Sequence, residues 1–387
     1  MGSGGIVYMK LLEYKAHEIF RLFGLPCSEG FVVSSAGELN NIKASLNYPV
    51  VIKAQVQTGG RGKAGGVQFA DNFQELAEIS TAIFDMKIKN LPVKKVFITS
   101  KTDIKKEMYL SFTLDRKHKL PVMIFCPDGG IDINEIAELY PEKVVKVLLH
   151  PALEIDDYYI QYAIDKSGLE DKYNKSFKDI CRKLYKIFIE KDCLLAEINP
   201  LVANMEDNLL ALDGKIDIDD NALFRHPDIQ SFRDEMEDNL LVLDARKYNF
   251  LYIPIKNEGN IAVISNGSGM IMSSIDLISK KGLTVTSALD LGGGATADRI
   301  NEALKIIASN PRVNTIFINI FGGITRCDEI ARGVESAMDK LGKTHLVLRL
   351  EGTNKDKGLE ILQKIQGSIR MAEGLTHAVG ILSGELN

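Results

Sequence analysis

Short apolar runs alternate with helical segments in the last third of the chain, and this alternation restricts the fold more than any other feature. After Pro254, runs rich in β-branched residues recur at regular intervals. Strands that alternate with helices form a parallel sheet whose two faces are covered by the helices. The predicted strands are Ile261–Ile264, Leu283–Leu289, Thr315–Ile320 and His345–Leu350, and the predicted helices lie near 270–280, 296–309, 327–341 and 356–366.

Three of these strands end in glycine-rich turns that open the following helices. The turns span Ser265–Gly269, Leu291–Thr296 and Phe321–Arg326. Each turn would place backbone N–H groups and a helix N-terminus at the carboxyl edge of the sheet, where open α/β sheets bind anionic ligands. Alternatively, a turn only packs its strand against its helix, and we expect this of at least one. The pattern predicts a ligand site at this edge.

The chain is too long for one ordinary core. Its 387 residues predict two or three domains. Residues 219–250 are charged and poor in strand signals, so we expect a helix or connector there and a domain boundary near residue 247. The opening residues Met1–Gly5 resemble a vector-derived leader, and Met9 is the expected native start. The predicted domains are therefore 9–246 and 247–387.

A glycine-rich loop lies within the first predicted domain. Gly59–Gly66 contains five glycines, Arg61 and Lys63, and it joins the β-rich run Tyr48–Ala54 to a second short strand. Because the loop returns into a strand instead of opening a helix, it is a hairpin flap and not a P-loop. Glycine lets the backbone approach phosphate oxygens closely. Lys53, at the end of an apolar strand, requires an anionic partner if it is buried. The alternative is a flexible basic surface loop.

An acidic hairpin offers metal ligands in the same predicted domain. Glu197 and Asn199 are two residues apart, so they share one face of a strand while Ile198 points into the core. A predicted partner strand ending at Asp213 would bring that carboxylate beside them. Carboxylate and amide oxygens suit Mg²⁺, which also binds substrate phosphates. The alternative is an ordinary polar hairpin face. A basic flap with an acidic hairpin is the combination that phosphoryl transfer requires.

Composition excludes several other classes of protein. The chain has 45% apolar and 26% charged residues, as soluble globular proteins do, and no apolar run reaches the roughly 20 residues that a membrane span needs. A net charge of -5 gives no reason to expect nucleic-acid binding. Five cysteines are scattered without C-x-x-C spacing, which favours a reducing compartment.

These motifs together resemble the β subunit of succinate–CoA ligase, over nearly the whole length from Met9. The matching segments are Val51–Val56, Gly59–Gly66, Glu197–Val202, Leu212–Lys215, Asn221–Arg225, Asn266–Gly269, Gly292–Ala295 and Asn319–Ile324. The resemblance implies an α/β fold in which an ATP-grasp domain is followed by a flavodoxin-like, doubly wound ligase domain. It also implies a reversible reaction in which succinyl-CoA, ADP (or GDP) and phosphate give succinate, CoA and ATP (or GTP).

Specific roles for residues follow from the same resemblance. Asn199 and Asp213 would hold one Mg²⁺ per subunit, and Glu197 would orient a phosphohistidine as catalytic residue. The nucleotide would be bound by Lys53, Gly60, Arg61, Gly62, Thr99, Thr102 and Glu107, and the carboxylic acid by Asn266, Gly323, Ile324 and Thr325. Thr99 stands where the family commonly has Glu, and Ser28 lies near a position that helps to set base preference, so ADP and GDP both remain open.

The family resemblance also implies a partner chain. None of the six histidines lies in a glycine-rich loop that could carry a phosphoryl group between sites. An α subunit would supply that phosphohistidine and most of the CoA site, in an αβ or (αβ)₂ heteromer. The expected location is the bacterial cytoplasm, or the mitochondrial matrix in a eukaryote.

Two other functions stay open at this point. A malate–CoA ligase β subunit would share the flap and the metal residues, and a non-catalytic nucleotide-binding subunit would fit the altered Thr99. A stand-alone ATP-grasp carboxylase is disfavoured, because it would not need the three glycine turns.

Overall fold

The chain forms two compact units that divide between Gln230 and Ser231. The computed structural model describes residues 8–129, 133–150, 154–237, 239–256, 258–365 and 369–385. The sequence placed the boundary near residue 247, some way into the second unit. Helix α8 (Leu240–Arg246) accounts for the difference, because Leu241, Val242 and Ala245 pack against the core of the second unit.

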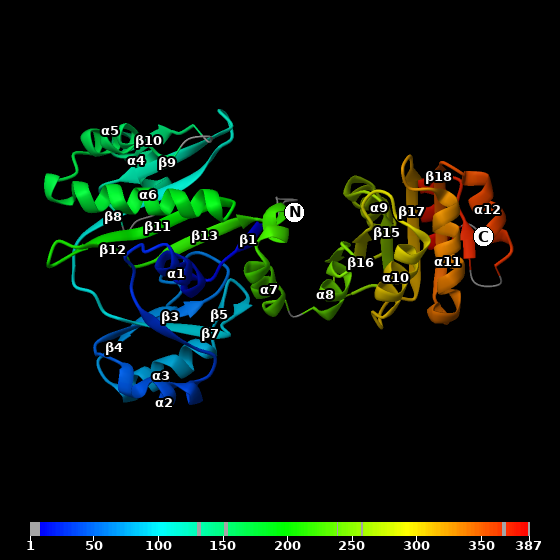
Figure 1. Cartoon of the computed structure of the whole chain (residues 1–387). Helices are drawn as coiled ribbons and strands as arrows, with labels where there is room; N and C mark the ends of the chain where they lie inside the picture. Colours follow the sequence, from blue (N-terminus) through cyan, green and yellow to red (C-terminus); the bar gives the residue numbers. More distant parts are fainter. Residues whose placement is uncertain are drawn as a thin grey trace. The chain divides into compact units, whose positions relative to one another are not determined.

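The first unit contains a small antiparallel sheet in the order β2-β7-β3-β4 (Figure 1). Its helix α3 (Phe73–Phe84) buries Leu76 and Ile83 against strands β3 and β4, and Asn72 caps the helix by accepting a hydrogen bond from the Glu75 amide. The remaining elements of this part are β2 (Gly30–Val33), α2 (Leu39–Ile42), β3 (Val50–Gln55), β4 (Val67–Ala70), β5 (Lys87–Ile88), β6 (Leu91–Pro92) and β7 (Lys95–Ser100).

A seven-stranded antiparallel sheet completes the first unit, in the order β1-β13-β11-β8-β9-β10, with β12 paired to β11. Helix α6 (Asn174–Glu190) lies along this sheet and buries an apolar stripe that includes Phe177 and Leu184 against β8 and β11 (Figure 1). The other elements are β1 (Tyr8–Lys10), α1 (Glu13–Leu22), β8 (Ile104–Asp115), β9 (Leu120–Cys126), α4 (Ile133–Leu139), β10 (Val145–Leu148), α5 (Asp157–Ser167), β11 (Cys193–Asn204), β12 (Leu209–Ala211), β13 (Gly214–Asp219) and α7 (Pro227–Glu235), which crosses the boundary.

The predicted hairpin around Glu197 is more elaborate than the sequence suggested. The sequence paired residues 194–198 with residues 209–213, but the long strand β11 pairs with two strands in turn. Its later half pairs with β12, through Leu201 and Ala211, whereas Glu197 pairs with Lys215 in β13. The chain turns between β12 and β13 at Asp213, whose carbonyl accepts a hydrogen bond from the Asn199 amide at 3.2 Å. Asp213 is therefore beside Asn199, as predicted.

The second unit is a sheet in the order β14-β16-β15-β17-β18-β19, parallel except for the antiparallel edge strand β14. The parallel strands follow the flavodoxin-like order, in which the strand order reverses beside β15. The elements are β14 (Leu251–Pro254), β15 (Ile261–Ser265), α9 (Ser268–Lys280), β16 (Val285–Asp290), α10 (Ala297–Ala308), β17 (Thr315–Gly322), α11 (Cys327–Leu341), β18 (His345–Gly352), α12 (Lys355–Gln363), β19 (Ile369–Met371) and α13 (Leu375–Leu382).

Alternate residues of these strands enter two separate apolar cores, one on each face of the sheet. In β15, Val263 joins the core beneath α9 and α13, whereas Ala262 and Ile264 join the core beneath α10 and α11. Both faces are thus covered by helices, as the sequence predicts for a parallel sheet. Among the described residues, no helix combines the length and the apolar character that crossing a bilayer requires.

Candidate functional site

The glycine loop is a hairpin flap, as predicted. Strands β3 and β4 pair antiparallel with Lys53 opposite Val67, and the loop joins them. The amides of Ala64, Gly65 and Gly66 donate to carbonyls within the loop. In the described part of the chain, the amides of residues 60–63 donate no hydrogen bond, so they are available to a ligand.

Two of the loop glycines have no structural reason to be glycine. A Cβ built on Gly59 or Gly62 meets no atom within 4 Å, and neither residue has a positive φ. Gly60 differs, because its φ of +83° favours glycine by backbone conformation alone. A glycine at such an open position lets a ligand approach the backbone closely, because no side chain is in the way.

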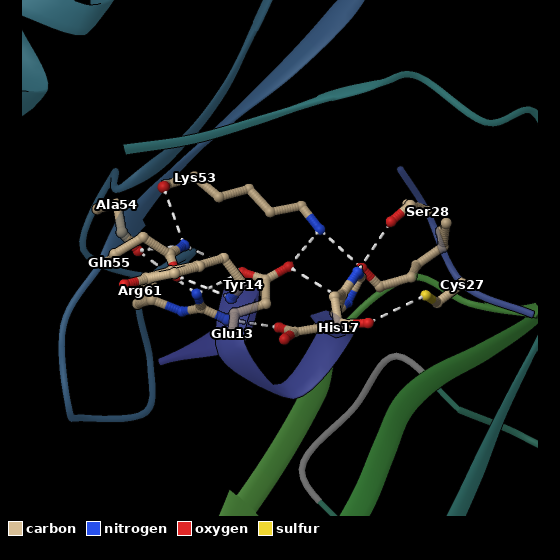
Figure 2. Close-up of polar contacts among 11 residues, drawn as sticks. Glu13, Tyr14, His17, Cys27, Ser28, Lys53, Ala54, Gln55 and Arg61 are labelled. Atoms are coloured by element: carbon tan, nitrogen blue, oxygen red, sulfur yellow. Dashed lines mark hydrogen bonds and ion pairs between the residues drawn. The ribbon is translucent and has the colours of Figure 1, made fainter. Parts of the chain in front are cut away.

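The anionic partner expected for Lys53 proves to be a carboxylate of the same chain. The Nζ of Lys53 donates to Glu13 Oε1 at 2.7 Å and to the carbonyl of Leu212 at 2.7 Å. Arg61 reaches from the flap to the same residue, with Nη1 2.5 Å from Glu13 Oε2 and Nη2 2.7 Å from Asp213 Oδ2. Figure 2 shows the side chains of Lys53, Gln55 and Arg61 converging on Glu13.

Charges of both signs balance in this cluster, although it is buried. Burial alone raises the pKa of Glu13, but the charges of Lys53 and Arg61 outweigh burial and hold that pKa at about 2. Burial alone lowers the pKa of Arg61, whereas Asp213 and Glu13 raise it well above its ordinary value. Arg61 therefore stays charged at neutral pH, as phosphate binding requires.

Glu13 is the residue of this site that sequence reasoning missed. It is the first residue of α1, and its side chain is 1% exposed. The signal was present, because Glu13 stands three and seven residues before the buried Ala16 and Phe20, on the face of the helix that packs into the core. A carboxylate on that face requires cationic partners, but periodicity does not say which ones.

The predicted metal ligands fit a hard cation. The side-chain oxygen Oδ1 of Asn199 is buried and, among the described residues, has no hydrogen-bond partner. Such an oxygen normally finds a donor or a cation. The Asn199 amide donates to the Asp213 carbonyl, so the two side chains start from adjacent points of the backbone. An amide oxygen and a carboxylate are a donor set that suits Mg²⁺, which keeps several of its waters.

Glu197 lies on the strand that carries Asn199. Its Oε2 accepts a hydrogen bond from the hydroxyl of Tyr109 on β8 at 3.0 Å. Burial raises the pKa of Glu197, while the charge of Lys215 and the Tyr109 hydrogen bond act in the opposite direction. Ile198, between the two polar residues, is fully buried, as the strand pattern predicts.

The other predicted nucleotide residues lie along the connection between the two sheets of the first unit. Thr99 is buried in β7, Thr102 is half-buried in the segment after it, and Glu107 is half-buried in β8. Within the described residues, no hydrogen bond or ion pair joins these side chains to Lys53 or Arg61. Their role as nucleotide ligands stays a prediction.

The three glycine turns of the second unit are linked to one another at the carboxyl edge of the sheet. Asn266 donates through Nδ2 to the Phe321 carbonyl at 3.0 Å and accepts from the Phe321 amide at 3.2 Å. The Gly294 amide donates to the Thr325 hydroxyl at 3.1 Å. Asn266 follows β15, and Phe321 lies at the end of the neighbouring strand β17. The strand order reverses between these two strands, and such a reversal is the usual ligand position in open α/β sheets.

The predicted acid-binding residues differ in what they can offer a ligand. A Cβ on Gly323 meets nothing within 4 Å, and the side chain of Ile324 is 84% exposed. Thr325 is buried and accepts from Gly294, so its hydroxyl supports the turn. Gly322 is a packing glycine, because a Cβ there would lie 2.0 Å from the Thr325 carbonyl oxygen. The turn after β17 thus contains one glycine required by packing, Gly322, and one that leaves space for a ligand, Gly323.

Four of the six histidines lie in a helix or a strand or are buried beside a carboxylate. His17 and His377 lie in helices α1 and α13, His345 begins β18, and His226 is buried and 2.8 Å from Asp192. None of the described histidines lies in a glycine-rich loop.

Comparisons with known proteins agree with this arrangement. A family model described as an ATP-grasp domain matches residues 10–203, and one described as a CoA-ligase matches residues 264–379. The fold is similar to ATP citrate lyase from Methanothrix soehngenii, with a TM-score of 0.76 at 15% identity over 98% of this chain and 100% of that chain.

Curated relatives carry a more specific name. The β subunit of ADP-forming succinate–CoA ligase from Chloroflexus aurantiacus is 40% identical over 382 residues, 98% of this chain and 100% of the relative. The corresponding subunit from Rickettsia massiliae is 41% identical over 379 residues, 96% of this chain and 98% of the relative.

An ATP-grasp domain joined to a CoA-ligase domain defines a nucleotide-dependent CoA ligase. Within that class, the chain belongs to the family of succinate–CoA ligase β subunits. A β subunit acts together with an α subunit. Neither a malate–CoA ligase nor a non-catalytic subunit is favoured by these comparisons.

Proposed function

We propose that the chain binds ADP or ATP under the flap and transfers a phosphoryl group between the nucleotide and a phosphohistidine of an α subunit. One observation carries this proposal. Arg61 pairs with the carboxylate of Asp213, and Lys53 donates to the carbonyl of the preceding residue, Leu212. The Asn199 amide donates to the Asp213 carbonyl, and the side-chain oxygen of Asn199 is buried without a partner among the described residues. Cations for phosphate and hard oxygen ligands for a metal are thus combined in one place.

The nucleotide phosphates would be held by Lys53, Arg61 and the amides around Gly60 and Gly62. Thr99, Thr102 and Glu107 would complete the nucleotide pocket. Asn199 and Asp213 would hold one Mg²⁺, which neutralises charge on the phosphates when it is bound. The names of the relatives favour ADP over GDP.

Glu197 would orient the phosphohistidine. Its carboxylate has one oxygen engaged by Tyr109, which fixes the side chain, and the other oxygen can accept a hydrogen bond from an imidazole N–H. A carboxylate on that nitrogen sets the orientation of the ring and stabilises its cationic form. The histidine would come from the α subunit together with most of the CoA site.

Succinate would bind at the turns of the second unit, at Asn266 and at the backbone of Gly323, Ile324 and Thr325. The exposed amide edge of Gly323 suits a carboxylate, since a Cβ there would meet only open space. The bacterial relatives support a place in the bacterial cytoplasm for the αβ or (αβ)₂ enzyme.

The test is a panel of acids. The chain, purified as a complex with its α subunit, is incubated with CoA, ATP, Mg²⁺ and either succinate or malate, and the acyl-CoA is measured. Succinyl-CoA should form at the higher kcat/KM. No acyl-CoA from succinate, or a preference for malate, would contradict the proposed substrate, and activity with GTP far above that with ATP would contradict the proposed nucleotide.

A further inference from the structure

The carboxylate of Glu13 touches both cations of the flap site, and the proposed reaction assigns it no role. We propose that Glu13 is a positioning residue, which fixes Lys53 and Arg61 at the spacing that holds the nucleotide phosphates for transfer. This inference rests on the proposed function of those two cations.

Each oxygen of Glu13 takes one cation. Oε1 accepts from Lys53 at 2.7 Å and Oε2 accepts from Arg61 at 2.5 Å, while the Gln55 amide nitrogen lies 3.3 Å from Oε2 (Figure 2). Gln55 in turn accepts from the Tyr14 amide at 3.2 Å, which ties the start of α1 to β3. The carboxylate is thus held from several sides and cannot change its position without disturbing both cations.

Both cations keep donors for a ligand. Lys53 has three N–H donors, and the described chain uses two of them, for Glu13 and for the Leu212 carbonyl. Arg61 has five donors, and its bonds to Glu13, Asp213 and the Ala54 carbonyl leave others available. Glu13 therefore places these groups without using up their capacity to bind phosphate.

Glu13 becomes more important once a metal is bound. Arg61 now shares its charge between Glu13 and Asp213, whose side chains are 1% and 33% exposed. If Asp213 served as a metal ligand, it would give up part or all of its pair with Arg61. Among the described residues, Glu13 is then the carboxylate that still holds the guanidinium. The buried Glu13 would keep Arg61 in place, while the more accessible Asp213 would exchange Arg61 for the metal.

A purely structural role predicts a different result. If Glu13 only stabilised the fold, its loss would reduce the fraction of sites that bind nucleotide, and each surviving site would work at the normal rate. A positioning role lowers kcat at every site. It leaves KM for ADP nearly unchanged, because removal of the carboxylate also removes a competitor for the two cations. Misplacement of a reacting group by about 1 Å costs on the order of 10²-fold in rate.

The experiment compares Glu13→Gln, Glu13→Asp and Arg61→Ala in the αβ complex, with ATP formation from succinyl-CoA measured per nucleotide-binding site. Glu13→Gln should lower kcat by roughly 10- to 100-fold with KM for ADP within about threefold. Glu13→Asp keeps the charge but is one methylene shorter, so it should fold and still lose at least about tenfold in kcat. The matched control is Asp207→Asn, which alters a carboxylate shared by Lys105 and Lys172 at the β11–β12 turn and should leave kcat unchanged.

Either of two results would overturn the inference. One is a normal kcat per site in Glu13→Asp; the other is a Glu13→Gln complex with fewer nucleotide-binding sites but a normal kcat at each of them. Arg61→Ala separates this failure from failure of the proposed function. If Arg61→Ala retains full activity, the flap site itself is misassigned. If Arg61→Ala is inactive while both Glu13 variants are normal, only the positioning role is wrong.

Discussion

Replacing Glu13 by Gln should destabilise the first unit strongly, and the loss should depend on pH in one direction. A carboxyl group whose pKa falls from 4.5 to about 2 on folding contributes about 3 kcal/mol at neutral pH, since each pKa unit is worth about 1.4 kcal/mol. Removing one partner of a buried ion pair typically costs about 3–5 kcal/mol, in agreement with the value from the pKa shift. The melting temperature of a unit of this size should fall by roughly 6–12 °C.

The sign of the pH dependence follows from the lowered pKa. The stabilisation is complete above the unfolded-state pKa of 4.5 and disappears as pH falls through that value toward 2. The difference between wild type and Glu13→Gln should therefore be about 3 kcal/mol at pH 7 and only about 2 kcal/mol at pH 3.5.

Urea unfolding of the full-length chain across this pH range measures the difference. The transition of the first unit is identified by its shift when ADP and Mg²⁺ are added. Glu18→Gln is the matched control, because Glu18 lies on the same helix in an exposed pair with Lys15 and should cost less than about 1 kcal/mol. A difference for Glu13→Gln below about 1 kcal/mol, or one that does not change with pH, would refute the electrostatic reasoning.

Other substitutions test the remaining parts of the site. Gly62→Ala should change the free energy of unfolding by less than about 0.5 kcal/mol, because the added methyl meets only open space, but should weaken ADP binding at least about tenfold by calorimetry. Gly333→Ala, whose methyl would lie 2.4 Å from Ile300 Cβ, should destabilise the fold and leave ADP binding unchanged. Asp213→Asn should lower turnover by on the order of 10²-fold and raise the Mg²⁺ concentration needed for half-maximal rate, and unchanged Mg²⁺ dependence would exclude Asp213 as a ligand. Gly323→Ala should raise KM for succinate by about tenfold without affecting the ATP-dependent phosphorylation step, and an equal loss in both would place Gly323 elsewhere.

The four interior strands of the second unit, and the helix that follows each of them, could be predicted from sequence. These interior strands are buried on both faces, so each appears as an uninterrupted apolar run, and Thr315–Ile320 lies within β17. The edge strands β14 and β19 and the last helix, α13, were missed. The two edge strands have only four and three residues and are not buried throughout, so neither shows such a run. The apolar pattern therefore identifies a strand reliably where the strand is buried on both faces, and poorly where the strand lies at the edge of the sheet.

The flap site shows where sequence reasoning ends. The loop, its hairpin and the need of Lys53 for an anion could all be inferred from neighbouring residues. The identity of that anion could not, because Glu13 is 40 residues from Lys53 and 48 from Arg61, and Asp213 is 152 residues from Arg61. Long-range pairs of this kind are determined by the packing of whole elements.

Transfer of phosphate from ATP to the α subunit tests the central claim most directly. The complex is mixed with ATP labelled in the γ-phosphate and with Mg²⁺, and both chains are examined after a single turnover. The label should appear on the α subunit as an acid-labile, base-stable phosphate, and Glu197→Gln should slow its appearance by about 10²-fold. Label on this chain, or no transfer in the intact complex, would contradict the account.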